Sequence, residues 1–140
     1  MRLDLRSIAE AAAHDPAKPL WDAAGDLSDY EIFHNLILVA TYIEPEKVGN
    51  IIMPDRRLDE DRFQGKIGLV LKVGPTAFVD DGATKFGGFE LMPGQWVIYR
   101  PSDGYELFIR DRRKANEGLS CRLIEDVFVR GRVSDPGLIY

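Results

Sequence analysis

Two histidines, His14 and His34, are the only side chains here of the type that commonly serves as a base near neutral pH. Neither has a serine, cysteine or carboxylate at a spacing that indicates a catalytic triad, because a triad needs a nucleophile, a base and an orienting group within mutual reach. His14 falls in an N-terminal segment and His34 just before the first apolar run. Both are therefore expected to be structural or surface residues.

Acidic and glycine-rich residues gather between positions 80 and 88. The Asp80-Asp81 pair could bind a cation, but two carboxylates beside Gly82 are more typical of a solvated turn. Gly82, Gly87 and Gly88 lack the G-x-x-x-x-G-K-[ST] pattern of a phosphate-binding loop, and no helix pattern follows them. No metal or cofactor is expected in this segment.

The single cysteine, Cys121, excludes a disulfide framework and a zinc site built from cysteines. The neighbouring Arg122 could lower the pKa of its thiol, although a cysteine that opens a strand is more often a small buried apolar residue. The net charge of −5 argues against nucleic-acid binding as the main role, since phosphate contact needs a surplus of basic residues. The residues thus indicate no enzyme and no cofactor.

Apolar side chains in one loop and at the two ends of the sequence are more informative about function than the polar residues above. Ile51, Ile52 and Met53 follow Gly49 in a charged loop over residues 49–65, and apolar residues on such a loop indicate a binding partner. The alternative is that the triplet folds back onto the scaffold and fills its interior. A loop that becomes ordered on docking binds weakly at each site, so it works best on an oligomer that presents many copies.

The two ends of the sequence carry similar apolar residues. Residues 1–34 include Leu5, Ile8 and Trp21, and the alanine-rich stretch over 5–13 favours a helix that ends before Pro16 and Pro19. This segment is read either as an arm that packs on another subunit or as a loosely held terminus. After Pro136 the sequence finishes in a short apolar tail, for which we expect partner contacts at Leu138, Ile139 and Tyr140.

The elements that must position these residues are strands. Short apolar or alternating runs predict strands over 36–43, 66–73, 95–100, 105–110, 121–124 and 127–133, separated by glycine and proline turns. Residues 76–92 are expected to form a long loop or a loose hairpin, and Ser102-Asp103-Gly104 a tight turn between two strands. The pattern predicts an all-β protein, a small antiparallel barrel over 35–134 with an N-terminal, partly helical arm (1–34) and a C-terminal tail (135–140).

Four segments in order resemble the GroES-like co-chaperonin family. They are Gly49–Pro54 with its apolar triplet, Gly65–Pro75, Met92–Tyr99 and Leu123–Val129. The resemblance implies a small Greek-key β-barrel that forms a sevenfold ring capping a chaperonin, with Ile51, Ile52 and Met53 as the contact residues. The family's pair of glycines before the triplet is Gly49-Asn50 here, residues 1–34 have no counterpart, and 74–93 do not match the family's roof hairpin closely.

The ending Ser134-Asp135-Pro136-Gly137, with the segment Arg122–Asp126 before it, looks most like GroES-like proteins encoded by tailed bacteriophages. That branch implies a virion protein, a capsid decoration or cement protein whose partners are the major capsid protein and further copies of itself. Its expected location is the capsid, and the host cytoplasm during assembly. The alternative is a working co-chaperonin that binds the host chaperonin. A small β-barrel nucleotide hydrolase is a third, weaker reading, because its phosphate-binding motifs are missing. No nucleic acid or membrane partner is expected.

Overall fold

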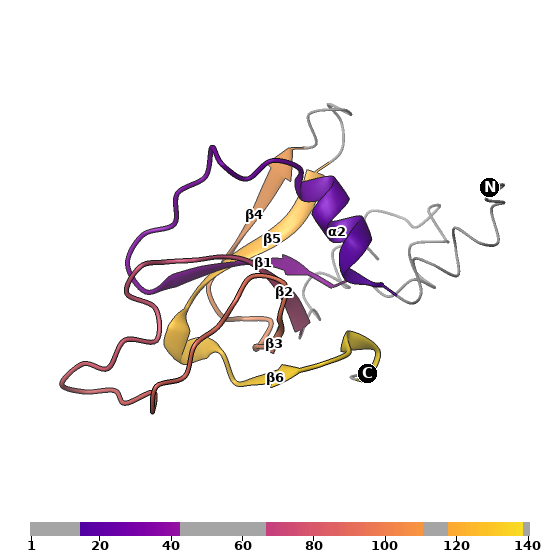
Figure 1. Ribbon diagram of the computed structural model, residues 1–140. Helices are drawn as coiled ribbons and strands as arrows, with labels where there is room; N and C mark the ends of the chain where they lie inside the picture. The colour runs from indigo at the N-terminus through magenta and orange to yellow at the C-terminus, as the bar shows by residue number, and fades with distance from the viewer. Residues whose placement is uncertain (1–14, 43–66, 111–117, 139–140) are drawn as a thin grey trace, which may run out of the picture.

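The computed structural model describes residues 15–42, 67–110 and 118–138 (Figure 1). These residues form one α-helix, six β-strands and two short 3-10 helices. The helix is α2, Ala17–Ala24. The strands are β1 (Leu36–Thr41), β2 (Ile67–Val73), β3 (Trp96–Ile98), β4 (Tyr105–Arg110), β5 (Gly118–Glu125) and β6 (Gly131–Val133). The 3-10 helices are η1 (Asp126–Phe128) and η2 (Pro136–Leu138).

All six strands join one antiparallel sheet in the order β4-β5-β1-β2-β3-β6. The all-β class expected from the sequence is confirmed for the described residues, with α2 as their single α-helix. The sheet is not closed, because β4 and β6 stand at its two ends and do not pair with each other. The expected barrel is therefore not confirmed.

The centre of the sheet is buried on both faces. In β1, every residue from Ile37 to Thr41 is buried, as the unbroken apolar run over 36–43 predicts for a strand covered on both sides. In β2, residues 67–71 are all buried, although the sequence pattern suggested simple alternation. The register between the two strands shifts at Leu38 and Val39, where Leu71 is the extra residue of a β-bulge.

One face of the sheet is covered by α2 and the segment after it. The helix-side cluster contains Leu20, Ala24 and Leu27 from this cover, packed on Leu38, Ala40, Ile67, Leu69, Leu71, Trp96, Ile109, Leu119 and Cys121. The helix expected over 5–13 lies outside the described residues, whereas α2 was not predicted and contains Pro19 as its third residue. The first four N–H groups of a helix have no acceptor within it, so a proline there removes no hydrogen bond.

The other face is covered by the long loop, residues 76–92, called the strap below. Phe78 and Leu91 from the strap join Ile37, Val39, Val70, Val97, Tyr99 and Ile124 in the strap-side cluster. Phe78 packs edge-on against Phe86 and Phe89, with ring centroids 5.4 and 5.0 Å apart. The strap thus supplies the second half of the apolar core, a role that its glycines and aspartates did not indicate.

The expected tight turn between two strands is present over residues 101–104, between β3 and β4, which do not pair with each other. The strand expected over 127–133 is wrong, because η1 interrupts it and only Gly131–Val133 is extended and paired. The cause is Asp126, whose side chain and carbonyl hold the chain in a turn. Strand β5, in contrast, is longer than the expected 121–124.

Candidate functional site

Only two of the predicted partner-contact residues, Trp21 and Leu138, lie within the described residues. Trp21, on α2, is half-buried and packs against the helix-side cluster of its own chain. Leu138, at the end of η2, is 70% exposed, the highest exposure among the large apolar side chains that the structure describes. The others lie outside the described residues, namely Leu5, Ile8, Ile51, Ile52, Met53, Ile139 and Tyr140.

The points where arm, loop and tail join the described fold lie around one apolar cluster. For the arm, Ala17 at the start of α2 packs against the helix-side cluster. For the loop, Tyr42 donates its backbone N–H to the carbonyl oxygen of Ile67 at 3.0 Å, and both residues belong to the helix-side cluster. For the tail, Val133 packs on the same cluster and pairs with Trp96, whose ring meets that of Tyr42 edge-on at 5.4 Å. Described residues next to all three segments therefore pack on the helix-covered side of the sheet.

The residues with potential for catalysis are held in structural roles. Cys121 is completely buried, and burial raises the pKa of its thiol to about 12, so it carries no thiolate at neutral pH. The interpretation of Cys121 as a small buried residue is thus confirmed. His34 is exposed at a positive φ of 58° directly before β1, where its carbonyl oxygen accepts the N–H of Thr76. His14 lies outside the described residues.

The two aspartates of the strap organise its turns. One Oδ1 oxygen of Asp81 accepts the N–H groups of Ala83 and Thr84 at 2.7 and 2.6 Å, and these bonds lower the pKa of the exposed Asp81 carboxyl. Asp80 accepts the N–H of Phe86 at 2.6 Å. These contacts fit the solvated-turn interpretation. Among residues 15–42, 67–110 and 118–138, no group of three His, Cys, Asp or Glu side chains could hold a metal ion.

A buried carboxylate that sequence reasoning did not single out ties the strap to the sheet. Asp126, 5% exposed, accepts a hydrogen bond from the Asn35 side-chain amide and another from the Phe78 backbone N–H, both at 3.0 Å. Its own N–H donates to the Asn35 carbonyl oxygen. Phe78 has a positive φ of 62°, an uncommon conformation for a bulky residue, so this contact holds a strained strap residue in place. The acidic pair Glu125-Asp126 inside the otherwise apolar run 123–129 was the available signal.

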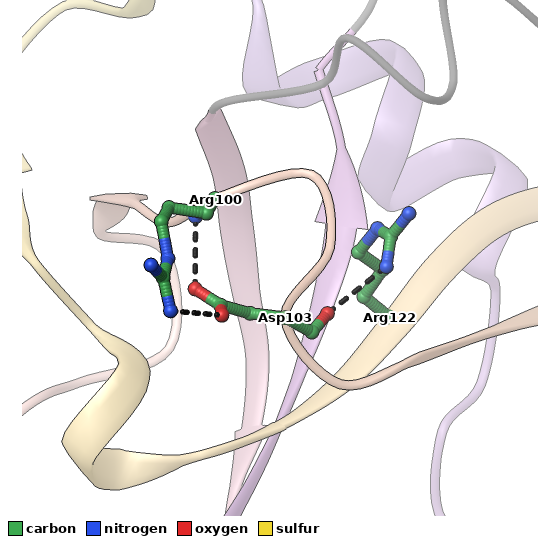
Figure 2. A network of polar contacts seen from close by, with 3 residues as sticks. All are labelled: Arg100, Asp103 and Arg122. Carbon is green, nitrogen blue, oxygen red and sulfur yellow. Dashed lines mark hydrogen bonds and ion pairs between the residues drawn. The ribbon is translucent and has the colours of Figure 1, made fainter.

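A second buried network fixes the turn between β3 and β4 (Figure 2). Asp103, 4% exposed, accepts the Arg100 backbone N–H at 3.0 Å and lies 3.3 Å from the Arg100 guanidinium. Arg122, 5% exposed, donates to the Asp103 carbonyl oxygen at 2.9 Å. The network therefore binds the turn to β5, and its charged groups are already engaged.

A buried tyrosine lies on the same face as this network. Burial raises the pKa of Tyr99, while Thr41 and Arg122 nearby act in the opposite direction. The Tyr99 hydroxyl makes no hydrogen bond of good geometry within the described residues, although Thr41 lies beside it. A phenol in this setting stays protonated at neutral pH and offers no base.

Taken together, the described residues supply a scaffold covered on both faces with apolar segments joined to one side. Within the same residues, no helix has the length and apolar character needed to cross a bilayer. Comparison of the chain with protein-family models gives no match, and a search of curated proteins finds no relative.

Proposed function

We propose that this protein is a structural component of a bacteriophage particle, a capsid decoration or cement protein with a GroES-like scaffold. Its partners are the major capsid protein and further copies of the chain. The relation to the GroES-like family is inferred from the sequence motifs; three of the four overlap β2, β3 and β5.

The observation that carries the proposal is that described residues next to arm, loop and tail pack on one side of the sheet. Ala17, Tyr42 and Val133 all pack against the helix-side cluster. Segments that leave one side of a rigid scaffold can bind one partner surface together, so each adds to the affinity without a new scaffold contact. Apolar side chains buried there contribute roughly 25 cal/mol per Å² removed from water.

The test is recovery of the protein in purified particles. A cement protein is expected at a fixed ratio to the major capsid protein, measured by quantitative mass spectrometry, and particles without it are expected to lose their contents at a lower temperature. The matched variants are Leu138→Ala, in the tail, and Val79→Ala, in the strap, which remove similarly exposed apolar side chains. Retention in the particle should fall for the first and not for the second. Absence of the protein from purified particles contradicts the proposal.

The second candidate is a co-chaperonin that assists folding of the capsid protein. The specific observation in its favour is that residues 43–66 depart from and return to paired strand ends, since Thr41 pairs with Gly68 and Tyr42 bonds to Ile67. A loop with such a base is suited to reach a partner as one unit. This function predicts ATP-dependent binding to the host chaperonin that is lost in an Ile51→Ala/Ile52→Ala variant and kept in Val79→Ala.

A further inference from the structure

Strand β4 is an exposed end of the sheet. It has six residues, against three in β6 at the opposite end, and the two lie far apart along the sheet (Figure 1). Its side chains include Tyr105 and Phe108, which are 58% and 54% exposed. A long edge strand with exposed aromatic residues is a template for pairing with another strand, and most edges are shortened or covered against this.

We propose that two copies of this chain pair through β4, antiparallel, with Phe108 on the twofold axis. Such pairing makes one continuous sheet from two copies. A twofold contact is self-complementary, so the sequence of β4 alone decides whether and in which register it forms.

Charge complementarity selects this register. Residues opposite each other must point to the same face of the joined sheet, so the twofold axis falls on a residue and not between two. With the axis on Phe108, Glu106 of each copy lies opposite Arg110 of the other copy, which makes two ion pairs by symmetry. Leu107 then lies opposite the partner's Ile109. With the axis on Leu107, Glu106 lies opposite the partner's Phe108 and no charges pair. Opposite charges across a strand pair stabilise it.

Strand β6 fails the same test. It carries Arg132, and Arg130 lies directly before it. A twofold axis on Arg132 places that residue opposite its own copy, and an axis on Gly131 places Arg130 opposite the partner's Arg132. Like charges directly opposite destabilise a pair of strands. The self-complementary edge is therefore β4.

Two residues of β4 already interact within the chain. Glu106 lies opposite Arg122 of β5, and both Glu106 and Phe108 make a further contact in their own copy. The proposed pairing places a second strand on the outer side of β4. It is compatible with the contacts that Glu106 and Phe108 already make within their own copy. The inference goes beyond the proposed function, because it holds equally for a virion protein and for a soluble one.

The register is tested by cross-linking. In a Phe108→Cys variant, the two introduced thiols lie opposite each other at the axis, within the range of Cα distances that a disulfide spans. The native Cys121 is buried and does not compete. A disulfide-linked dimer is expected under mild oxidation for Phe108→Cys and not for the control Val79→Cys, an equally exposed position on the strap. Efficient cross-linking of Leu107→Cys in place of Phe108→Cys overturns the register.

The affinity is tested by sedimentation equilibrium of the full chain. Arg110→Glu brings acidic side chains together twice and is expected to raise the dissociation constant at least about tenfold, whereas Arg130→Glu, the same charge change at the other edge, leaves it unchanged. Mixing Arg110→Glu with Glu106→Arg restores both ion pairs and the dimer. Circular dichroism verifies that each variant is folded.

Two results overturn the inference. One is a wild-type chain that stays monomeric up to its solubility limit and fails to cross-link at Phe108→Cys. The other is a closed ring of odd copy number, which a twofold contact cannot build. A closed ring of odd copy number contradicts the β4 pairing but not the co-chaperonin candidate. Absence of the protein from phage particles contradicts the proposed function but not the β4 pairing, so the two failures are distinguishable.

Discussion

Removal of the Asp126 carboxylate tests whether the strap is held mainly by one buried group. In Asp126→Ala, the buried backbone N–H of Phe78 loses its hydrogen-bond acceptor, which costs about 1–3 kcal/mol of stability. The half-buried side-chain amide of Asn35 also loses an acceptor, which costs about 0.5–1.5 kcal/mol. The free energy of unfolding is therefore expected to fall by about 2–4 kcal/mol. Since domains of this size are stable by roughly 5–15 kcal/mol, this is a large fraction.

The matched control is Asp81→Ala. Asp81 also accepts two backbone N–H groups from the strap, but it is fully exposed, so water replaces its oxygens. The two variants thus remove the same number of hydrogen bonds and differ in burial. Asp126→Asn adds a geometric test, because Asn35 and Phe78 donate to different oxygens of Asp126 and asparagine replaces one of these oxygens with an NH2 group that cannot accept.

The assay is urea unfolding followed by circular dichroism, with hydrogen exchange at the Phe78 amide as a local measurement. Asp126→Ala is expected to lower the unfolding midpoint and to speed exchange at Phe78 well beyond any change in Asp81→Ala. In thermal unfolding, the loss corresponds to roughly 6–15 °C. Equal losses in the two alanine variants would refute the reasoning, since burial would then make no difference.

Three further outcomes are expected. Native Cys121 resists a thiol reagent at pH 8 and reacts once the protein is unfolded. Because the pKa of its thiol in the folded protein lies above the unfolded value of 9.0, its contribution to stability is complete below pH 9 and is lost as the pH rises toward 12, by at most about 1.4 kcal/mol per pH unit. A Cys121→Ala variant therefore shows a shallower decline of stability with pH in alkaline urea titrations. Gly68→Ala costs about 1–3 kcal/mol in the same titrations, since a Cβ there lies 2.9 Å from an aromatic ring and from a valine, whereas Gly82→Ala, with open space around it, is tolerated. Trp21→Ala lowers the thermal midpoint because the ring packs on the core, and Leu138→Ala, on an exposed side chain, leaves it unchanged.

The sequence predicts strands correctly where the apolar pattern involves residues that are close together along the chain. The apolar run of β1 and the run before Gly74-Pro75 in β2 each lead to the expected strand, because strand formation there depends on residues a few positions apart. The helix across Pro19 was missed, since proline is unfavourable only beyond the first turn.

The features that depend on distant contacts could not be predicted from the sequence. The three phenylalanines of the strap have no regular spacing, so nothing indicated that they cover the sheet. Strand order also arises from pairings between residues far apart, such as Leu36 with Glu125. For the candidate site, the structure places Leu138 at the surface, and its expected contact role stays a prediction. The half-burial of Trp21 in its own chain depends on the tertiary structure.

The position of β1 sets a condition on biosynthesis. This strand appears first on the ribosome, yet it pairs on one side with β5, so the nascent polypeptide cannot complete its central sheet until residue 125 has been translated. Before then, β1 and β2 expose an unpaired edge beside a strongly apolar surface, which is the kind of intermediate that aggregates. The central sheet therefore forms only after β5 has been translated, and a chain truncated before β5 cannot complete it.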